Sequence, residues 1–360
     1  MRRSVRLDRR IQAGAAQVVL AVRSGEPSWT ELGTRLDGLR ADRFLVVTDG
    51  TAPEDTLAGV RALAADRAPT TVHDLRDGPL PAGARAGAAV LAVGGEHACG
   101  LPADVRVPTD LAAACGPALA LPRPVPTTLV WVRADTLAAR PAAWNRAGAV
   151  AVVRHVLAVC PAHHPTLAAV LHPGARYDER TLTALLALCA DARAALVCFD
   201  PDETGPALAL GYGRSLADAV RAVAGPDLAP GDAEALGLLI AARVAIRLGL
   251  AAGDTGWAHR ELLARNGSAT ALPGGVDVDR LTAALVAAAG PGLLLLADLG
   301  RPYCADGRLL TRVDGAVLRA AVESLAGRAG TGVPRSRAAV PEPAGARAVP
   351  VGGTGGPGAA

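Results

Sequence analysis

The segment from Leu208 to Val220 carries two charged residues whose spacing could support chemistry at a ligand site. Its letters, Leu-Ala-Leu-Gly-Tyr-Gly-Arg-Ser-Leu-Ala-Asp-Ala-Val, are typical of a loop that faces a substrate and then enters a helix. Arg214 and Asp218 are four residues apart, so their side chains share one face of that helix and can meet. The spacing therefore predicts an ion pair at the start of the helix.

A second cluster, Cys160-Pro-Ala-His163-His164, has the residue types of a metal-ligand set. It comes at the predicted end of a helix, just before Pro165, and this position favours a surface turn. The six cysteines form no Cys-x-x-Cys pair, so we expect buried reduced thiols. All 37 basic residues are arginine, which excludes a lysine Schiff base and a lysine general base.

Length and charge narrow the class of protein. A chain of 360 residues is long enough for two domains with a sizeable core. Its net charge is only +3 and its basic residues are spread along the chain, which argues against nucleic acid as a partner. No run of 18 apolar residues and no apolar N-terminal segment occurs, so we expect no membrane span and a cytoplasmic protein.

The N-terminal part has the pattern of a parallel sheet with crossover helices. Short apolar runs that end at polar turns predict three buried strands, Phe44–Asp49, Ala88–Gly95 and Val125–Val132. A helix is predicted between the first two, at Pro53–Asp66. Ligands of such sheets bind at the carboxyl ends of the strands, where Asp49, Gly94 and Gly95 fall.

After about residue 146 the pattern becomes helical. Six helices are predicted, at Asn145–Val159, Glu179–Phe199, Ser215–Val223, Asp232–Leu250, Trp257–Arg265 and Val278–Ala289. Leu293–Gly300 is predicted to be a late strand. We therefore expect an α/β domain over residues 1–145, an all-α domain over 146–330, and a disordered tail over 331–360, which is rich in Pro, Gly, Ala and Arg.

Four stretches resemble one superfamily. They are Asp42–Asp49, Val125-Pro-Thr-Thr-Leu129, Tyr177–Leu250 and Gly292–Arg312, and together they span most of residues 40–325. They are similar to the sugar phosphate cyclases of the 3-dehydroquinate synthase type, and most similar to the 2-deoxy-scyllo-inosose synthases. The resemblance implies an NAD-binding α/β domain, an all-α metal and substrate domain, and a dimer. It also implies a carbon–oxygen lyase reaction that eliminates phosphate from a sugar phosphate such as glucose 6-phosphate.

The metal-ligand positions that the resemblance implies carry other residues in this chain. The family's Glu, His and His ligands correspond to Ala151, Arg214 and Asp232. One carboxylate and one guanidinium cannot hold zinc or cobalt, since zinc requires about three protein ligands. We therefore predict no metal. His155 lies one helical turn beyond Ala151, and Asp218 lies one turn beyond Arg214, so these two residues could form a substitute ligand set with Asp232. We favour instead an ion-pair cluster of Arg214 with Asp218 and Asp232.

The cofactor and catalytic positions are altered as well. The implied cofactor contacts are Asp49, Gly94, Gly95, Thr127 and Thr128. Glu96 replaces the third glycine of the family's glycine run, and its negative charge disfavours a pyrophosphate. Binding of NAD is therefore implied by the resemblance alone. A structural role would also explain these residues, with Asp49 as a cap at the end of a strand and Thr127 and Thr128 as part of a turn.

The implied catalytic positions are Arg154, Arg193 and Glu234, with arginine where the family has lysine. Arginine can bind phosphate but cannot serve as a tunable base, and Glu234 could equally be a solvated or capping carboxylate. The long connection after the family's Pro-Thr-Thr turn is also mostly missing, with the segment 131–144 in its place.

These changes leave two main hypotheses for the function. The favoured one is a noncatalytic homologue that binds a sugar phosphate or a nucleotide, forms a homodimer, or pairs with an active cyclase in an aminoglycoside-type pathway. The alternative is an active cyclase that converts a substrate such as glucose 6-phosphate to a carbocycle. A metal-free reaction in the same pocket, with Arg154 and Arg193 as an anion clamp, lacks a nucleophile–base pair.

Overall fold

The computed structural model describes residues 4–120, 127–225, 228–229 and 231–326. The predicted tail over residues 331–360 lies outside this range. A division near residue 146 stays a prediction.

A seven-stranded sheet forms the core of the N-terminal part, in the order β1-β2-β7-β6-β5-β3-β4. The strands are β1 (Arg6–Ala13), β2 (Ala16–Arg23), β3 (Phe44–Thr48), β4 (Thr70–Asp74), β5 (Ala89–Gly94), β6 (Val105–Pro108) and β7 (Leu129–Arg133). The first two form an antiparallel hairpin, and all other neighbours are parallel. The expected α/β fold with a parallel sheet is confirmed.

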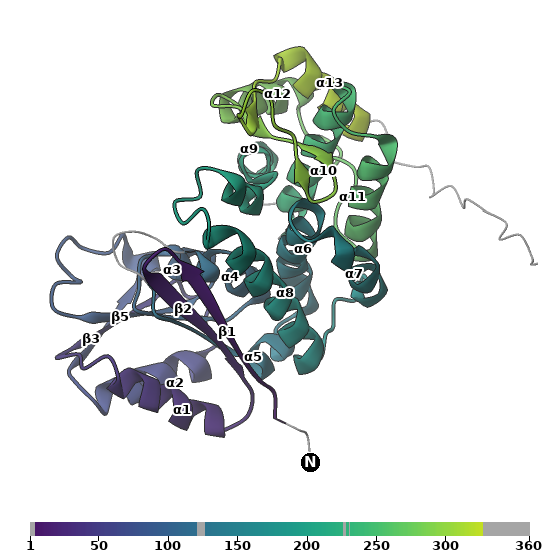
Figure 1. Cartoon of the computed structure of the whole chain (residues 1–360). Coiled ribbons are helices and arrows are strands. Elements are labelled where there is room, and N and C mark those ends of the chain that lie inside the picture. Colours follow the sequence, from purple (N-terminus) through teal and green to yellow (C-terminus); the bar gives the residue numbers. More distant parts are fainter. Residues whose placement is uncertain (1–3, 121–126, 226–227, 230, 327–360) are drawn as a thin grey trace, which may run out of the picture. The chain divides into compact units, whose positions relative to one another are not determined.

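Two helices, α1 (Pro27–Asp37) and α2 (Glu54–Ala65), cover one face of the sheet (Figure 1). Leu32 and Val60 from these helices pack with Phe44, Val46 and Trp131 of the strands. The other face packs against α4 (Leu111–Cys115) and α5 (Ala134–Ala139) and against helices from later in the chain. Both faces are thus buried, which explains the continuous apolar runs of the central strands.

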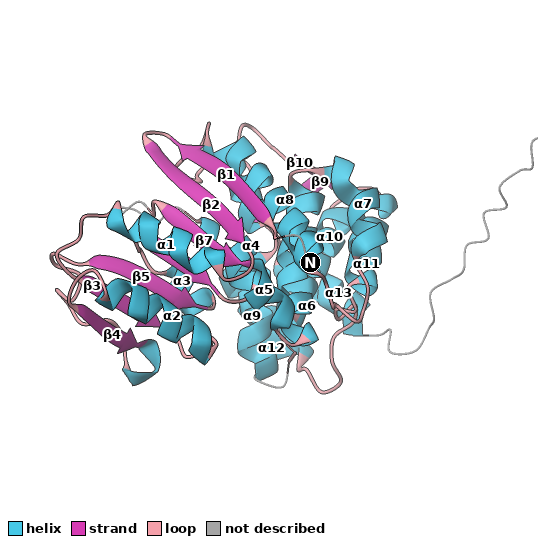
Figure 2. Ribbon diagram, turned by 90° about the horizontal axis from the view of Figure 1, so that it is seen from below, coloured by secondary structure: helices cyan, strands magenta, loops and turns pink. Residues whose placement is uncertain are grey.

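The C-terminal part consists mainly of packed helices (Figure 2). They are α6 (Ala142–Ala158), α7 (His164–Val170), α8 (Glu179–Val197), α9 (Arg214–Ala224), α10 (Asp232–Arg247), α11 (Gly253–Arg265), α12 (Val278–Ala288) and α13 (Gly315–Ala326). Four short strands accompany them, β8 (Leu293–Leu294), β9 (Leu296–Asp298), β10 (Arg301–Pro302) and β11 (Leu310–Thr311).

Two glycines allow the helices that carry the site to approach closely. A Cβ at Gly148 of α6 would come within 2.5 Å of the backbone nitrogen of Ala112 in α4. A Cβ at Gly237 of α10 would come within 2.5 Å of the carbonyl oxygen of Gly213, at the start of α9. Real Cβ atoms do not approach so closely, so both helix contacts require glycine.

The sequence predicted most of these elements. The six predicted helices correspond to α6 and α8 to α12, with ends shifted by a few residues. The third predicted strand begins later than expected, at Leu129, and the predicted late strand is divided into β8 and β9. The sequence interpretation missed β1, β2, β4 and β6. No helix among the described residues is long and apolar enough to cross a membrane.

Candidate functional site

A cavity of about 270 Å³ lies at the carboxyl ends of β3, β5 and β6, where α6, α9 and α10 meet the sheet loops. Its charged lining comes from both parts of the chain. Asp49, Glu96 and Asp110 follow the strands, whereas Arg154, Arg214, Arg221 and Glu234 lie on the helices. The cavity therefore combines carboxylates on one side with guanidinium groups on the other.

Asp49 is bound to the glycine turn that follows β5. Its carboxylate accepts hydrogen bonds from the backbone nitrogens of Gly95, at 3.1 Å, and Ala98, at 3.0 Å, and from Oγ1 of Thr51, at 2.6 Å. Burial opposes ionisation, but these hydrogen bonds outweigh it and lower the pKa of Asp49. A Cβ at Gly94, whose φ is +147°, would lie 2.3 Å from Oδ1 of Asp49, so the turn requires glycine there.

Asp110 is the most deeply buried carboxylate of the cavity. It follows β6 and caps α4, because its Oδ1 accepts a 2.8 Å hydrogen bond from the backbone nitrogen of Ala113. Burial raises the pKa of Asp110 to about 6, and nearby Glu96 raises it further against the effect of the Ala113 hydrogen bond. Glu96 is exposed and forms no hydrogen bond or ion pair with another described residue.

Arg154 of α6 forms an ion pair with Glu234 of α10 at the wall of the cavity. Glu234 also accepts a 3.3 Å hydrogen bond from Arg221 of α9. Burial lowers the pKa of Arg154 to about 10, and the charge of Arg214 lowers it further. The two implied catalytic residues Arg154 and Glu234 are thus brought together, and Glu234 is shared between two arginines.

The expected ion-pair cluster around Arg214 does not form. Asp218 pairs with Arg221 instead, at 2.7 Å, because three residues along a helix also bring side chains together. Asp232 accepts a 2.9 Å hydrogen bond from the backbone nitrogen of Ala269. Within the described ranges, Arg214 has no hydrogen bond and no ion pair, although it lines the cavity.

The substitute metal set is not assembled either. His155 is 3% exposed, and its Nδ1 lies 2.8 Å from the carbonyl oxygen of Ala151. Asp218 and Asp232 are held by the partners named above. Among the residues that the structure describes, no group of three or more His, Cys, Asp or Glu side chains could hold a metal ion.

The Cys160–His164 segment does not form a ligand set. Nε2 of His164 lies 3.6 Å from a carboxylate oxygen of Glu261. His163 and Cys160 line a separate apolar groove between α7 and α8.

Arg193 and the two threonines lie away from the cavity lining. Arg193 is buried in α8 and pairs with Glu203. Burial lowers the pKa of Arg193, Glu203 offsets part of this effect, and Arg214 adds to it. Thr128 donates a 2.9 Å hydrogen bond to the carbonyl oxygen of Asp104, just before β6.

Thr127 and Thr128 therefore lie at the amino ends of β6 and β7, on the opposite edge of the sheet from Gly94. The two threonines predicted as cofactor contacts thus do not lie beside Gly94 and Gly95. Pro108-Thr109-Asp110 begins with the same two residues and lies at the carboxyl edge, where Gly94 is in register with Pro108. The short segment before it, Val105-Arg106-Val107, alternates valine with arginine, and with the capping Asp110 it could have indicated this position from the sequence.

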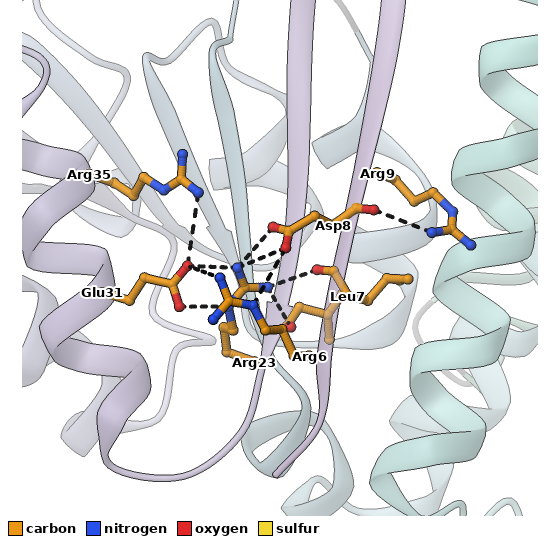
Figure 3. A network of polar contacts seen from close by, with 8 residues as sticks. Arg6, Leu7, Asp8, Arg9, Arg23, Glu31 and Arg35 are labelled. Atoms are coloured by element: carbon orange, nitrogen blue, oxygen red, sulfur yellow. Dashed lines mark hydrogen bonds and ion pairs between the residues drawn. The ribbon is translucent and has the colours of Figure 1, made fainter.

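A second charged network lies at the carboxyl end of β2 (Figure 3). Arg23 donates hydrogen bonds of 2.8 Å to Asp8 and 2.6 Å to Glu31. It also donates to the carbonyl oxygen of Leu7 at 2.8 Å. The buried guanidinium of Arg23 thus has hydrogen-bond partners within the fold, whereas Arg214 of the cavity has none among the described residues.

Comparison with known proteins decides the family. The 2-deoxy-scyllo-inosose synthase of Streptomyces lividus is 34% identical over an alignment that covers 86% of this chain and 94% of the relative. The chain belongs to the 2-deoxy-scyllo-inosose synthase family. The enzyme of that name from Streptoalloteichus tenebrarius is 30% identical, with 81% of this chain and 89% of the relative covered. No general protein-family model matches the chain.

Solved structures of cyclases share the fold of this family member. A crystal structure of 2-deoxy-scyllo-inosose synthase complexed with carbaglucose-6-phosphate, NAD+ and Co2+ aligns with a TM-score of 0.77 at 19% identity, covering 88% of this chain and 99% of the other. The 2-epi-5-epi-valiolone synthase of Streptomyces hygroscopicus, with NAD+ and Zn2+ bound, aligns with a TM-score of 0.64 at 18% identity, covering 84% and 96%. The dehydroquinate synthase-like fold is thereby confirmed.

Proposed function

We propose that this chain is a noncatalytic member of the 2-deoxy-scyllo-inosose synthase family that binds a sugar phosphate without NAD or a divalent metal. One observation carries the proposal. Ala151 and the unpaired Arg214 line the cavity at two positions that the resemblance assigns to metal ligands. A methyl group offers no donor atom, and a guanidinium repels a cation.

The residues at the glycine turn do not fit a dinucleotide pyrophosphate. The backbone nitrogens of Gly95 and Ala98 already donate to the carboxylate of Asp49. Glu96 and Asp110 add two more carboxylates to this side of the cavity. These carboxylates and a pyrophosphate are all negatively charged and would repel one another, so pyrophosphate binding would need an additional source of positive charge.

The size of the cavity supports one small ligand. Its volume of about 270 Å³ is below the 300–1,000 Å³ that is typical of small-molecule sites. A cavity of this size is large enough for a hexose phosphate. The related synthase structure named above holds a sugar phosphate analogue, NAD+ and Co2+ together.

Arg154, Arg214 and Arg221 support the binding of a phosphate. Among the described residues, Glu234 pairs with both Arg154 and Arg221, and Asp218 also pairs with Arg221, so two carboxylates face three guanidinium groups. Positive charge therefore remains on this side of the cavity, and guanidinium groups match phosphate oxygens in geometry.

We also propose that the chain acts as a subunit of a dimer, with a second copy or with an active cyclase. Phe199, at the end of α8, is 87% exposed, and an apolar groove between α7 and α8 lies on the same helix. Large exposed apolar side chains and grooves are typical of protein interfaces. Multi-angle light scattering of the purified protein, alone and mixed with an active synthase, tests this proposal.

Calorimetry tests the ligand proposal. Glucose 6-phosphate is titrated into the protein alone, then with NAD+, and then with NAD+ and Co2+. We expect saturable binding that neither addition strengthens. Tighter binding on addition of NAD+ and Co2+, together with stoichiometric bound metal in elemental analysis, would contradict the proposal and favour an active cyclase.

A further inference from the structure

The two sides of the cavity carry opposite net charge. We call Asp49, Glu96 and Asp110 the acidic side, and Arg154, Arg214 and Arg221 the basic side. The acidic side comes from the segments that follow β3, β5 and β6, and the basic side comes from α6 and α9. A ligand in this cavity therefore meets carboxylates at one end and guanidinium groups at the other.

Among the described residues, no cation forms a hydrogen bond or an ion pair with the acidic side, although Arg140 and Arg154 act on it through space. Asp49 is held by backbone amides and by Thr51, and Glu96 has neither a hydrogen bond nor an ion pair among the described residues. Asp110 is only 2% exposed, yet it lines the cavity. Its Oδ1 caps α4, while no described residue donates to its Oδ2. The second oxygen of this largely buried carboxylate is therefore open to a donor in the cavity.

The basic side also has donors without an acceptor. Arg154 is 2% exposed, and its Nε has no hydrogen-bond partner in the part of the chain that the structure describes. Arg214 lacks any such partner, as shown above. Burial of a charged donor without an acceptor is costly for Arg154, and Arg214 is exposed at the same end of the cavity, so an anion there would satisfy Arg154 and contact Arg214.

We propose that the cavity binds a zwitterionic phosphorylated amino sugar, with its phosphate on the basic side and its ammonium group on the acidic side. This inference rests on the proposed function and narrows the ligand class. In a pyranose, substituents at carbon 2 and carbon 6 lie on opposite sides of the ring, so one molecule presents both charges. A sugar phosphate without an amino group would bring no cation to Glu96 and Asp110.

The test compares glucosamine 6-phosphate with glucose 6-phosphate, which differ by one amino group. Both are titrated by calorimetry at about pH 6.5, below the usual pKa of an amine of this type, about 7.7. We expect glucosamine 6-phosphate to bind about tenfold more tightly, the typical effect of one charged hydrogen bond. Glu96→Gln and Asp110→Asn should each reduce this preference, whereas Glu54→Gln, on α2 and outside the cavity lining, should not.

Three outcomes are informative. A preference for the amino sugar that Glu96→Gln and Asp110→Asn reduce supports the inference. Equal affinity for both ligands overturns it but leaves the proposed sugar phosphate function intact. If neither ligand binds, the proposed function fails and the inference fails with it. Circular dichroism of each variant confirms that any lost preference does not come from unfolding.

Discussion

Oδ1 of Asp218 accepts a 2.7 Å hydrogen bond from Arg221, whereas Arg214, on the same helix, pairs with no residue that the structure describes. The spacing of residues in the sequence could not decide whether Arg214 or Arg221 pairs with Asp218. Arg221 belongs to a charge chain that runs from Asp218 through Glu234 to Arg154. Arg214 also lines the cavity, outside this charge chain, and is therefore available to a ligand.

Arg214→Gln should weaken the binding of glucose 6-phosphate by about tenfold or more, because it removes a charge-assisted hydrogen bond to the phosphate. Calorimetry measures the change. Arg10→Gln, at an exposed position on β1, is the matched control and should have no effect. Unchanged affinity in Arg214→Gln would show that the phosphate does not bind at this end of the cavity.

Asp110→Asn should stabilise the protein by about 1–3 kcal/mol at pH 8, since the native pKa of about 6 lies above the unfolded value of about 3.9. Burial is the main cause of the raised pKa, with Glu96 and Asp49 raising it and Arg140 lowering it. The folded state therefore holds the proton more tightly, and wild-type stability should fall as the pH rises through 6. Asparagine can still cap α4.

Urea unfolding of wild type and Asp110→Asn at several pH values measures this difference. We expect the two proteins to converge below about pH 4, where Asp110 is protonated in both states. A constant difference at all pH values would show that Asp110 is ionised normally in the folded protein.

Glu31→Gln should destabilise the protein by about 1–2 kcal/mol at pH 7, because Arg23 is 5% exposed at its side chain and would lose an ionised partner. The hydrogen bond from Arg23 lowers the pKa of Glu31. This stabilisation is therefore present above the unfolded pKa of Glu31 and is lost as the pH falls through the lower, native value. Thermal unfolding should show a larger difference between the two proteins at pH 7 than at pH 3.

A combined variant, Ala151→Glu with Arg214→His and Asp232→His, should gain a divalent metal. It restores one carboxylate and two imidazoles, the three protein ligands that a catalytic zinc or cobalt site needs. Elemental analysis after dialysis against Co2+ measures the gain, and Arg214→His alone is the control that should stay empty. If the unmodified protein already carries one metal per chain, the assignment of these positions is wrong.

The sequence predicted the fold well because its signals are local. The apolar run Phe44–Thr48 and the helix Glu179–Val197 can be identified from their own residues. The hairpin of β1 and β2 was missed because its exposed strand carries Arg6, Asp8 and Arg10, which interrupt an apolar pattern.

The site was predicted less completely because it depends on pairings between distant segments. Arg154, Arg214 and Glu234 were identified and do line one cavity. The choice of Arg221 as the partner of Asp218 depends on side-chain geometry that spacing alone does not fix. Thr127 and Thr128 were predicted to contact the cofactor because they match the family's Pro-Thr-Thr turn, and the sheet register places them at the edge opposite Gly94.

Phosphate release from glucose 6-phosphate tests the absence of catalysis most directly. The purified protein is incubated with the sugar phosphate, NAD+ and Co2+, and inorganic phosphate is followed by phosphorus NMR beside a sample without protein. We predict no release above that of the protein-free sample. Catalytic release of phosphate, with many turnovers per chain and loss on removal of NAD+ or Co2+, would contradict the account.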